Sequence, residues 1–209
     1  MDRPVAESWA AILGWLEACL PGAFEKLEPA SESAVREAAE RLLPGDLVAW
    51  LEISNGFAEL GTFGNLIPVL HNPIPFQGML SSRDQLRRSY ADWPKPGSDL
   101  PAGSSSREWL DEFLPIADSG TDVWLFVDLR PGELFGCVGQ FESEDGCASP
   151  RWSSVAAMLA DVAEALTDGR PALRDFANRE AERGVRVTAT WSPTVQNGRL
   201  RWQPDIQRT

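Results

Sequence analysis

The chain has 209 residues, of which 43% are hydrophobic and 24% charged, and its formal net charge at pH 7 is −12. This composition is typical of a globular domain and excludes an intrinsically disordered chain. The negative charge disfavours direct binding to nucleic acid and to anionic membranes. No apolar run reaches the roughly 20 residues needed to span a bilayer, and no signal peptide is visible. These features predict a cytoplasmic protein.

The first quarter of the chain is predicted to be helical. Apolar residues recur with helical spacing from Trp9 to Leu20, and Pro21-Gly22 ends that pattern. A second helix is expected after Ser31 as N-cap, with residues 35–42 supplying its apolar face. Asp46 follows a Pro-Gly break and is expected to accept backbone N–H groups at the start of a short third helix.

The next stretch is predicted to contain one edge strand, one helix and a loop. The apolar run Leu66–Leu70 contains Pro68, which favours an edge strand or an extended segment. Ser82 and Gln85 have capping-box spacing and predict a helix that begins there and carries Leu86, Tyr90 and Trp93. Residues 94–106 are rich in Pro, Gly and Ser, which predicts a mobile surface loop.

The strongest strand signal lies at residues 123–127, which are apolar throughout and indicate a central strand buried on both faces. Turn residues around Pro131-Gly132 predict a hairpin with residues 135–141. Gly136 and Gly139 within that returning strand indicate a bulge or a close backbone approach. An acidic turn, Glu142–Gly146, follows.

The last third is predicted to be a helix and then an appended tail. Ser153 is expected to cap a helix over residues 155–166, which Gly169 ends. The tail, residues 170–209, reads as a charged helix, a one-sided strand over 185–191 and a hairpin at Asn197-Gly198. That hairpin is expected to extend the main sheet or to cover one of its edges. The element order predicts an α+β fold, with a domain over residues 1–169 and the tail packed on it.

The residues that could carry chemistry give no catalytic, metal or cofactor site. His71 is the only histidine and lies in a Pro-rich loop, where we expect a solvated or locally hydrogen-bonded imidazole. Cys19, Cys137 and Cys147 lack metal-ligand or disulfide spacing, and no glycine-rich phosphate loop is present. The one basic region is interpreted as a surface that balances the acidic body. It comprises Arg179, Arg183, Arg186, Arg199, Arg201 and Arg208.

Several short motifs occur together in a characteristic order. Leu-Pro-Gly-Asp-Leu at 43–47 is followed by Trp50-Leu51 and Asn55-Gly56, then by Phe-Leu-Pro-Ile-Ala-Asp-Ser-Gly at 113–120. Leu-Phe-Val-Asp at 125–128 and Gly-Cys-Val at 136–138 come next. This series resembles the SMI1/KNR4 family of the SUKH superfamily over roughly residues 5–168. The resemblance implies one α+β domain with a central, mostly antiparallel sheet flanked by helices.

The resemblance also implies a class of function. Bacterial members are similar to immunity proteins that bind and neutralise toxins, often nucleases, and fungal members resemble a regulator of cell-wall synthesis that binds other proteins. We therefore expect a non-enzymatic protein whose partner is a basic toxin domain. A regulatory or scaffold module is the alternative, and a hydrolase that uses acidic residues ranks last. The candidate partner-binding residues are Asp118, Asp122, Glu142, Glu144 and Asp145. The sequence carries no signal for oligomeric state.

Overall fold

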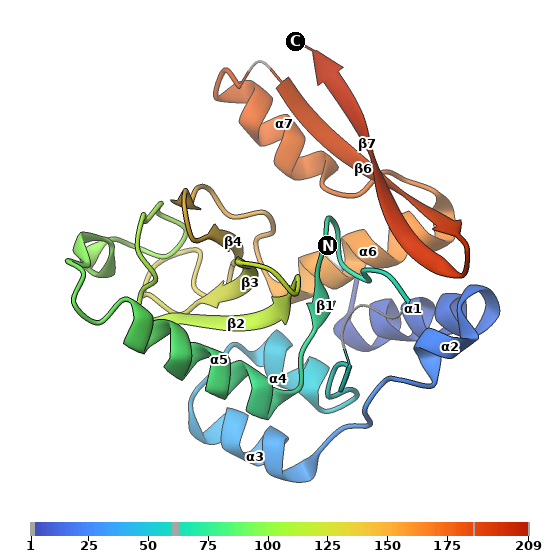
Figure 1. Cartoon of the computed structure of the whole chain (residues 1–209), viewed down its shortest axis with the longest axis horizontal. Coiled ribbons are helices and arrows are strands. Elements are labelled where there is room, and N and C mark those ends of the chain that lie inside the picture. Colours follow the sequence, from blue (N-terminus) through green and yellow to red (C-terminus); the bar gives the residue numbers. More distant parts are fainter. Residues whose placement is uncertain (1–2, 60–62, 186, 209) are drawn as a thin grey trace.

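The computed structural model describes residues 3–59, 63–185 and 187–208, and it has an α+β fold (Figure 1). Four helices begin the chain: α1 (Val5–Cys19), α2 (Pro21–Phe24), α3 (Glu32–Glu40) and α4 (Gly45–Leu51). Pro21 ends α1 as predicted, but it also begins α2, since proline suits the first position of a helix. The Ser31 hydroxyl accepts a hydrogen bond from the Ala34 amide at 3.4 Å, which confirms the predicted N-cap of α3. Leu42 was expected on the buried face of that helix, yet it is 84% exposed because α3 has already ended.

The main sheet has five antiparallel strands in the order β1-β2-β3-β4-β5. They are β1 (Asn72–Pro73), β2 (Phe113–Asp118), β3 (Val123–Asp128), β4 (Val138–Glu142) and β5 (Gly146–Cys147). The predicted strand over 123–127 is confirmed as the central one. The edge strand lies at 72–73 and not at 66–70, because Ile67 and His71 pair with each other across a tight turn.

Both faces of the sheet are covered, which explains the unbroken apolar run of β3. Leu125 and Val127 belong to the larger hydrophobic core, which includes buried residues of α1, α4 and α6 (Val155–Asp168). Trp124 and Phe126 face a second, aromatic cluster built around Trp109. The close approach predicted at Gly139 is confirmed, since a Cβ there would lie 2.5 Å from the Phe126 ring.

Two predicted helix starts are wrong. Helix α5 (Phe76–Ser89) runs along β2 in Figure 1 and begins six residues before Ser82, where the Asn55 side chain accepts the Phe76 amide at 3.0 Å. Helix α6 is capped by Ser154 and not by Ser153, because the Ser154 hydroxyl accepts the Ala157 amide at 3.0 Å. Gly169 ends α6 in the left-handed conformation, as predicted.

The tail forms α7 (Arg174–Glu182) and a long hairpin of β6 (Val187–Gln196) and β7 (Arg199–Arg208), which rises beside α7 in Figure 1. Asn197 and Gly198 both have positive φ, as a two-residue hairpin turn requires. The hairpin is a separate two-stranded sheet, so the alternative that it extends the main sheet is wrong. Arg186, part of the predicted strand, lies outside the described residues.

Both strands of the hairpin form hydrogen bonds with the rest of the chain. Ala172 pairs with Trp191, the Leu200 amide donates to the Phe63 carbonyl at 2.8 Å, and the Trp202 indole donates to the Asn65 carbonyl at 2.9 Å. Along each strand, backbone groups point alternately towards the partner strand and towards the outer edge. Pro193 of β6 and Pro204 of β7 stand at positions whose backbone groups point to the outer edge, like those of Trp191 and Leu200. A proline there has no N–H to offer another strand, so each outer edge lacks one donor at that position.

Candidate functional site

The candidate partner-binding residues gather at one end of the main sheet. The β2–β3 connection carries Asp118 and Asp122, and β4 with its turn into β5 carries Glu142, Glu144 and Asp145. The two turns are neighbours, since the Ser143 amide donates to the Asp122 carbonyl at 3.2 Å. We call this set of five carboxylates the acidic sheet end.

The five carboxylates differ in their surroundings. Asp118 is half-buried and accepts the Gly120 amide at 2.8 Å, so it stabilises its own turn, and burial raises the pKa of its carboxyl. Glu142 is half-buried and accepts a hydrogen bond from the Gln140 side chain at 2.5 Å. The side chains of Asp122, Glu144 and Asp145 are exposed. Within the described residues, none of the five forms an ion pair. The acidic sheet end therefore presents negative charge that no ion pair of the described residues neutralises, and Arg151 is the cation that interacts with Glu142 at longer range.

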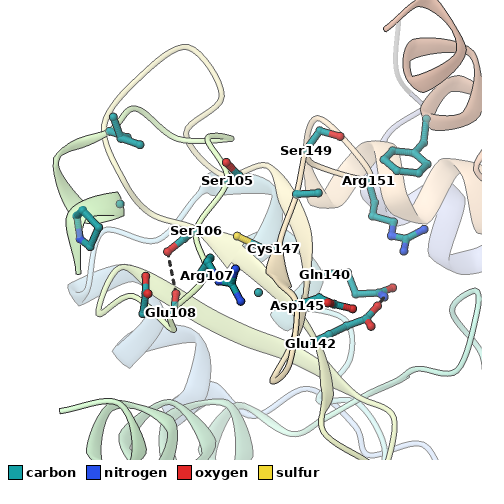
Figure 2. Close-up of a pocket in the computed structure, with 16 residues that line it drawn as sticks. Ser105, Ser106, Arg107, Glu108, Gln140, Glu142, Asp145, Cys147, Ser149 and Arg151 are labelled. Carbon is teal, nitrogen blue, oxygen red and sulfur yellow. Dashed lines mark hydrogen bonds between the residues drawn. The ribbon is translucent and has the colours of Figure 1, made fainter. Parts of the chain in front are cut away.

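A groove of about 520 Å³ lies beside the acidic sheet end (Figure 2). Glu142 and Asp145 line it together with Arg107 and Glu108 from the segment before β2. Arg151 lies over the Phe176 ring of α7, with its guanidinium carbon 4.9 Å from the ring centroid. The groove thus combines apolar walls with charges of both signs. Such a lining is better suited to bind the surface of another protein than a small apolar ligand.

One wall of this groove is held by a buried ion pair. Arg130 is fully buried and its guanidinium lies 2.6 Å from the Asp128 carboxylate. The same guanidinium donates to the carbonyls of Gly97 and Ser104, both at 2.7 Å, and Asp128 accepts the Gly103 amide at 2.8 Å. The segment 96–106, predicted to be a mobile surface loop, is therefore tied to the end of β3. This ion pair was not predicted, although the sequence places Asp128 at the end of the apolar strand and Arg130 two residues later.

An aromatic cluster supports the sheet from the side of that segment. The Trp109 ring packs edge-on against Phe113, Phe126 and Phe141, with centroid distances of 5.6, 5.8 and 5.3 Å. Tyr90, just after α5, continues the cluster through an edge contact with Phe141 at 5.7 Å. Such contacts give the acidic sheet end a rigid base.

The single histidine and two of the three cysteines are buried, whereas Cys19 is exposed. His71 was predicted to be solvated or locally hydrogen-bonded. It is 1% exposed, so the solvated alternative is wrong, and burial lowers its pKa to about 3. Burial also raises the thiol pKa of Cys137 to about 12 and that of Cys147 to about 11, so both stay protonated at pH 7. In the described part of the chain, no three His, Cys, Asp or Glu residues are placed to hold a metal ion. Nor is any helix there long and apolar enough to cross a membrane.

Two arginines of the predicted basic tail form contacts within the chain. Arg179 donates to the carbonyls of Pro150 and Arg151, both at 3.1 Å, and Arg183 pairs with Glu180. Arg186 and the side chain of Arg208 lie outside what the structure describes. Arg179 thus helps to attach α7 to the segment that leads into α6.

Comparison with known families assigns the fold. The model of the SMI1 / KNR4 family (SUKH-1) matches residues 29–161. The chain belongs to this family. The family match runs from just before α3 into α6, so it includes the main sheet, the buried ion pair and the acidic sheet end, while α7 and the hairpin lie beyond it. Membership makes this chain an immunity-type or protein-interaction domain. A search of the curated proteins found no match.

Proposed function

We propose that this SUKH protein is a cytoplasmic, non-enzymatic immunity protein that neutralises a cognate toxin by binding it directly. The observation that carries the proposal is the acidic sheet end, whose five carboxylates form no ion pair with a cation of the described residues. Toxin nucleases are commonly basic, because their substrate is a polyanion. An unneutralised acidic surface attracts such a partner and speeds its association.

The shape of the region also supports a protein partner. A standard interface buries about 800 Å² on each side, around a few aromatic or charged anchors. The acidic sheet end and the groove are continuous, because Glu142 and Asp145 belong to both, and Phe176 adds an aromatic side chain to the groove. Glu142 and Asp145 contribute to the groove, and Glu144 lines a second hollow that shares Arg107 and Glu108 with it.

The state of the potential catalytic groups supports a binding role. A general base must be accessible to the substrate and must have a pKa near neutral pH. His71 is buried and neutral, and the two buried thiols lack the low pKa of reactive cysteines. The function proposed here needs no chemistry from these groups.

The division of the chain is part of the proposal. Residues 1–169 form the family domain and residues 170–209 an extension packed on it through the Leu200–Phe63 and Trp202–Asn65 hydrogen bonds. In support, the family match ends at residue 161, and the extension has its own two-stranded sheet.

Co-expression tests this function. The toxin-like product of a neighbouring gene is expressed in a sensitive host with and without this protein, and the two purified proteins are mixed in a pull-down. We expect restored growth and a stable complex. If the toxin kills equally in both cultures, the immunity proposal is wrong. A complex with a neighbouring protein that is not toxic would instead favour the regulatory module.

A further inference from the structure

A second hollow, of about 360 Å³, lies next to the groove, with which it shares Arg107 and Glu108. Tyr90 and Trp93, which follow α5, line it together with Glu144 of the β4–β5 turn. We call it the aromatic hollow. Its remaining lining residues are Ser89, Arg107, Glu108 and Ser143.

The aromatic side chains of this hollow are unusual in this protein. All nine tryptophans lie in the described residues, and Trp93 is the one that is largely exposed, at 59%. It stands 6.1 Å from Tyr90 between ring centroids, at an angle of 55°. Tyr90 is fixed from behind by Phe141. Tryptophan and tyrosine are enriched among the residues that contribute most to binding at protein interfaces. An exposed Trp93 beside Tyr90 therefore suits a contact with a partner protein.

The charges around these rings are mainly negative. Glu108 and Glu144 line the hollow without an ion pair in the described residues, against a single arginine, Arg107. The negative charge of Asp122 also reaches the hollow. Burial is the main reason that the pKa of the Tyr90 phenol is raised, and the Asp122 carboxylate adds to this effect. An acidic ligand group would be repelled here, and an apolar one would desolvate carboxylates without pairing them.

We propose that the aromatic hollow binds an arginine side chain of the partner protein, with the guanidinium against the Trp93 and Tyr90 rings and paired with Glu144. A planar guanidinium can stack on an aromatic face and form a fork of hydrogen bonds to a carboxylate at the same time. This inference rests on the proposed function and deepens it, because it names the residue type that anchors the partner.

The test uses the full ¹⁵N-labelled chain and two capped tripeptides, acetyl-Gly-Arg-Gly-amide and its citrulline analogue, which is neutral and nearly isosteric. The readout is the Trp93 indole ¹H–¹⁵N signal, assigned by its loss in Trp93→Phe. We expect a saturable shift with the arginine peptide and none with the citrulline peptide. Glu144→Gln should weaken arginine binding about threefold or more, in line with exposed cation–π and ion-pair energies. Glu17→Gln, a matched change of an exposed glutamate on α1, should leave it unchanged.

Equal shifts with both peptides, or equal binding by wild type and Glu144→Gln, would overturn the inference. So would full neutralisation of the toxin by Trp93→Ala, a substitution at an exposed position that should not disturb folding. Full neutralisation by Trp93→Ala would refute arginine binding at this hollow but would agree with the immunity function. Conversely, if the protein binds the arginine peptide but neutralises no neighbouring toxin, only the immunity function is refuted.

Discussion

The burial of His71 makes the stability of this protein depend on pH in a defined way. The imidazole has a pKa of about 3 in the folded chain, chiefly because of burial, and about 6.5 when unfolded. Above pH 6.5 both states are neutral and His71 has no effect. As the pH falls from 6.5 towards 3, only the unfolded state takes up the proton, so the folded state loses stability.

The size of the effect follows from the proton linkage. One proton bound only by the unfolded state changes the free energy of unfolding by up to about 1.4 kcal/mol per pH unit. Integrated from pH 7 to pH 5, the His71 contribution is a loss of about 2 kcal/mol, and to pH 4 a loss of about 3 kcal/mol. The half-buried Asp118 and the more deeply placed Asp161 act in the opposite direction, since their raised carboxyl pKa values favour the folded state at low pH.

A variant that cannot titrate at this position isolates the histidine. Urea unfolding of wild type and His71→Leu at pH 7 and pH 5 gives four free energies of unfolding. The gap between the two proteins should shift by about 2 kcal/mol in favour of the variant at pH 5, whatever the variant's packing costs at pH 7. His71→Gln should show the same shift. A gap that stays constant between the two pH values would refute a buried, neutral His71.

Three further substitutions test the fold around the site. Arg130→Met leaves the Asp128 carboxylate buried without its partner, so it should lower the free energy of unfolding by about 3–5 kcal/mol and open the segment 96–106 to limited proteolysis. An unchanged cleavage pattern would contradict the role of this ion pair in holding the segment. Gly139→Ala pushes a methyl group against a phenylalanine ring of β3 and should cost about 1–3 kcal/mol in urea unfolding. Ser154→Ala should cost about 1 kcal/mol, while Ser153→Ala, its exposed neighbour, should be neutral.

Local signals predicted the elements that depend on local chemistry. The buried run of β3, the left-handed Gly169 and the Asn197-Gly198 turn each need only their own residues or near neighbours, and all three occur as expected. The family motifs likewise lie within the elements that form the sheet. These features set the α+β fold class correctly.

The errors arise where a distant residue decides the outcome. Asn55 caps α5 from 21 residues away, so the capping-box pattern at Ser82 was misleading. Arg130 is buried because two carbonyls of the segment 96–106 and one carboxylate satisfy it together, which no local pattern reveals. Trp93 was expected on a helix face, yet α5 ends at Ser89 and leaves it exposed.

The candidate site was predicted in part. The acidic residues could be grouped from the sequence, because they lie on turns after strands that pair in one sheet. Their division between a groove and an aromatic hollow could not, since it depends on how α5 and the segment 105–108 lie beside the β4–β5 turn. Asp118 also differs from the other four, because its carboxylate is engaged by its own turn.

The most direct test of the account is the rate at which the cognate toxin associates with two variants of equal net charge. One variant neutralises four of the five carboxylates of the acidic sheet end, leaving Asp118, and the other neutralises four exposed glutamates elsewhere. The first carries Asp122→Asn, Glu142→Gln, Glu144→Gln and Asp145→Asn, and the second Glu17→Gln, Glu25→Gln, Glu40→Gln and Glu52→Gln. At low salt, the first should associate roughly tenfold more slowly than wild type and the second close to the wild-type rate, because steering depends on where the charge lies. Equal rates for the two variants would contradict binding through the acidic sheet end.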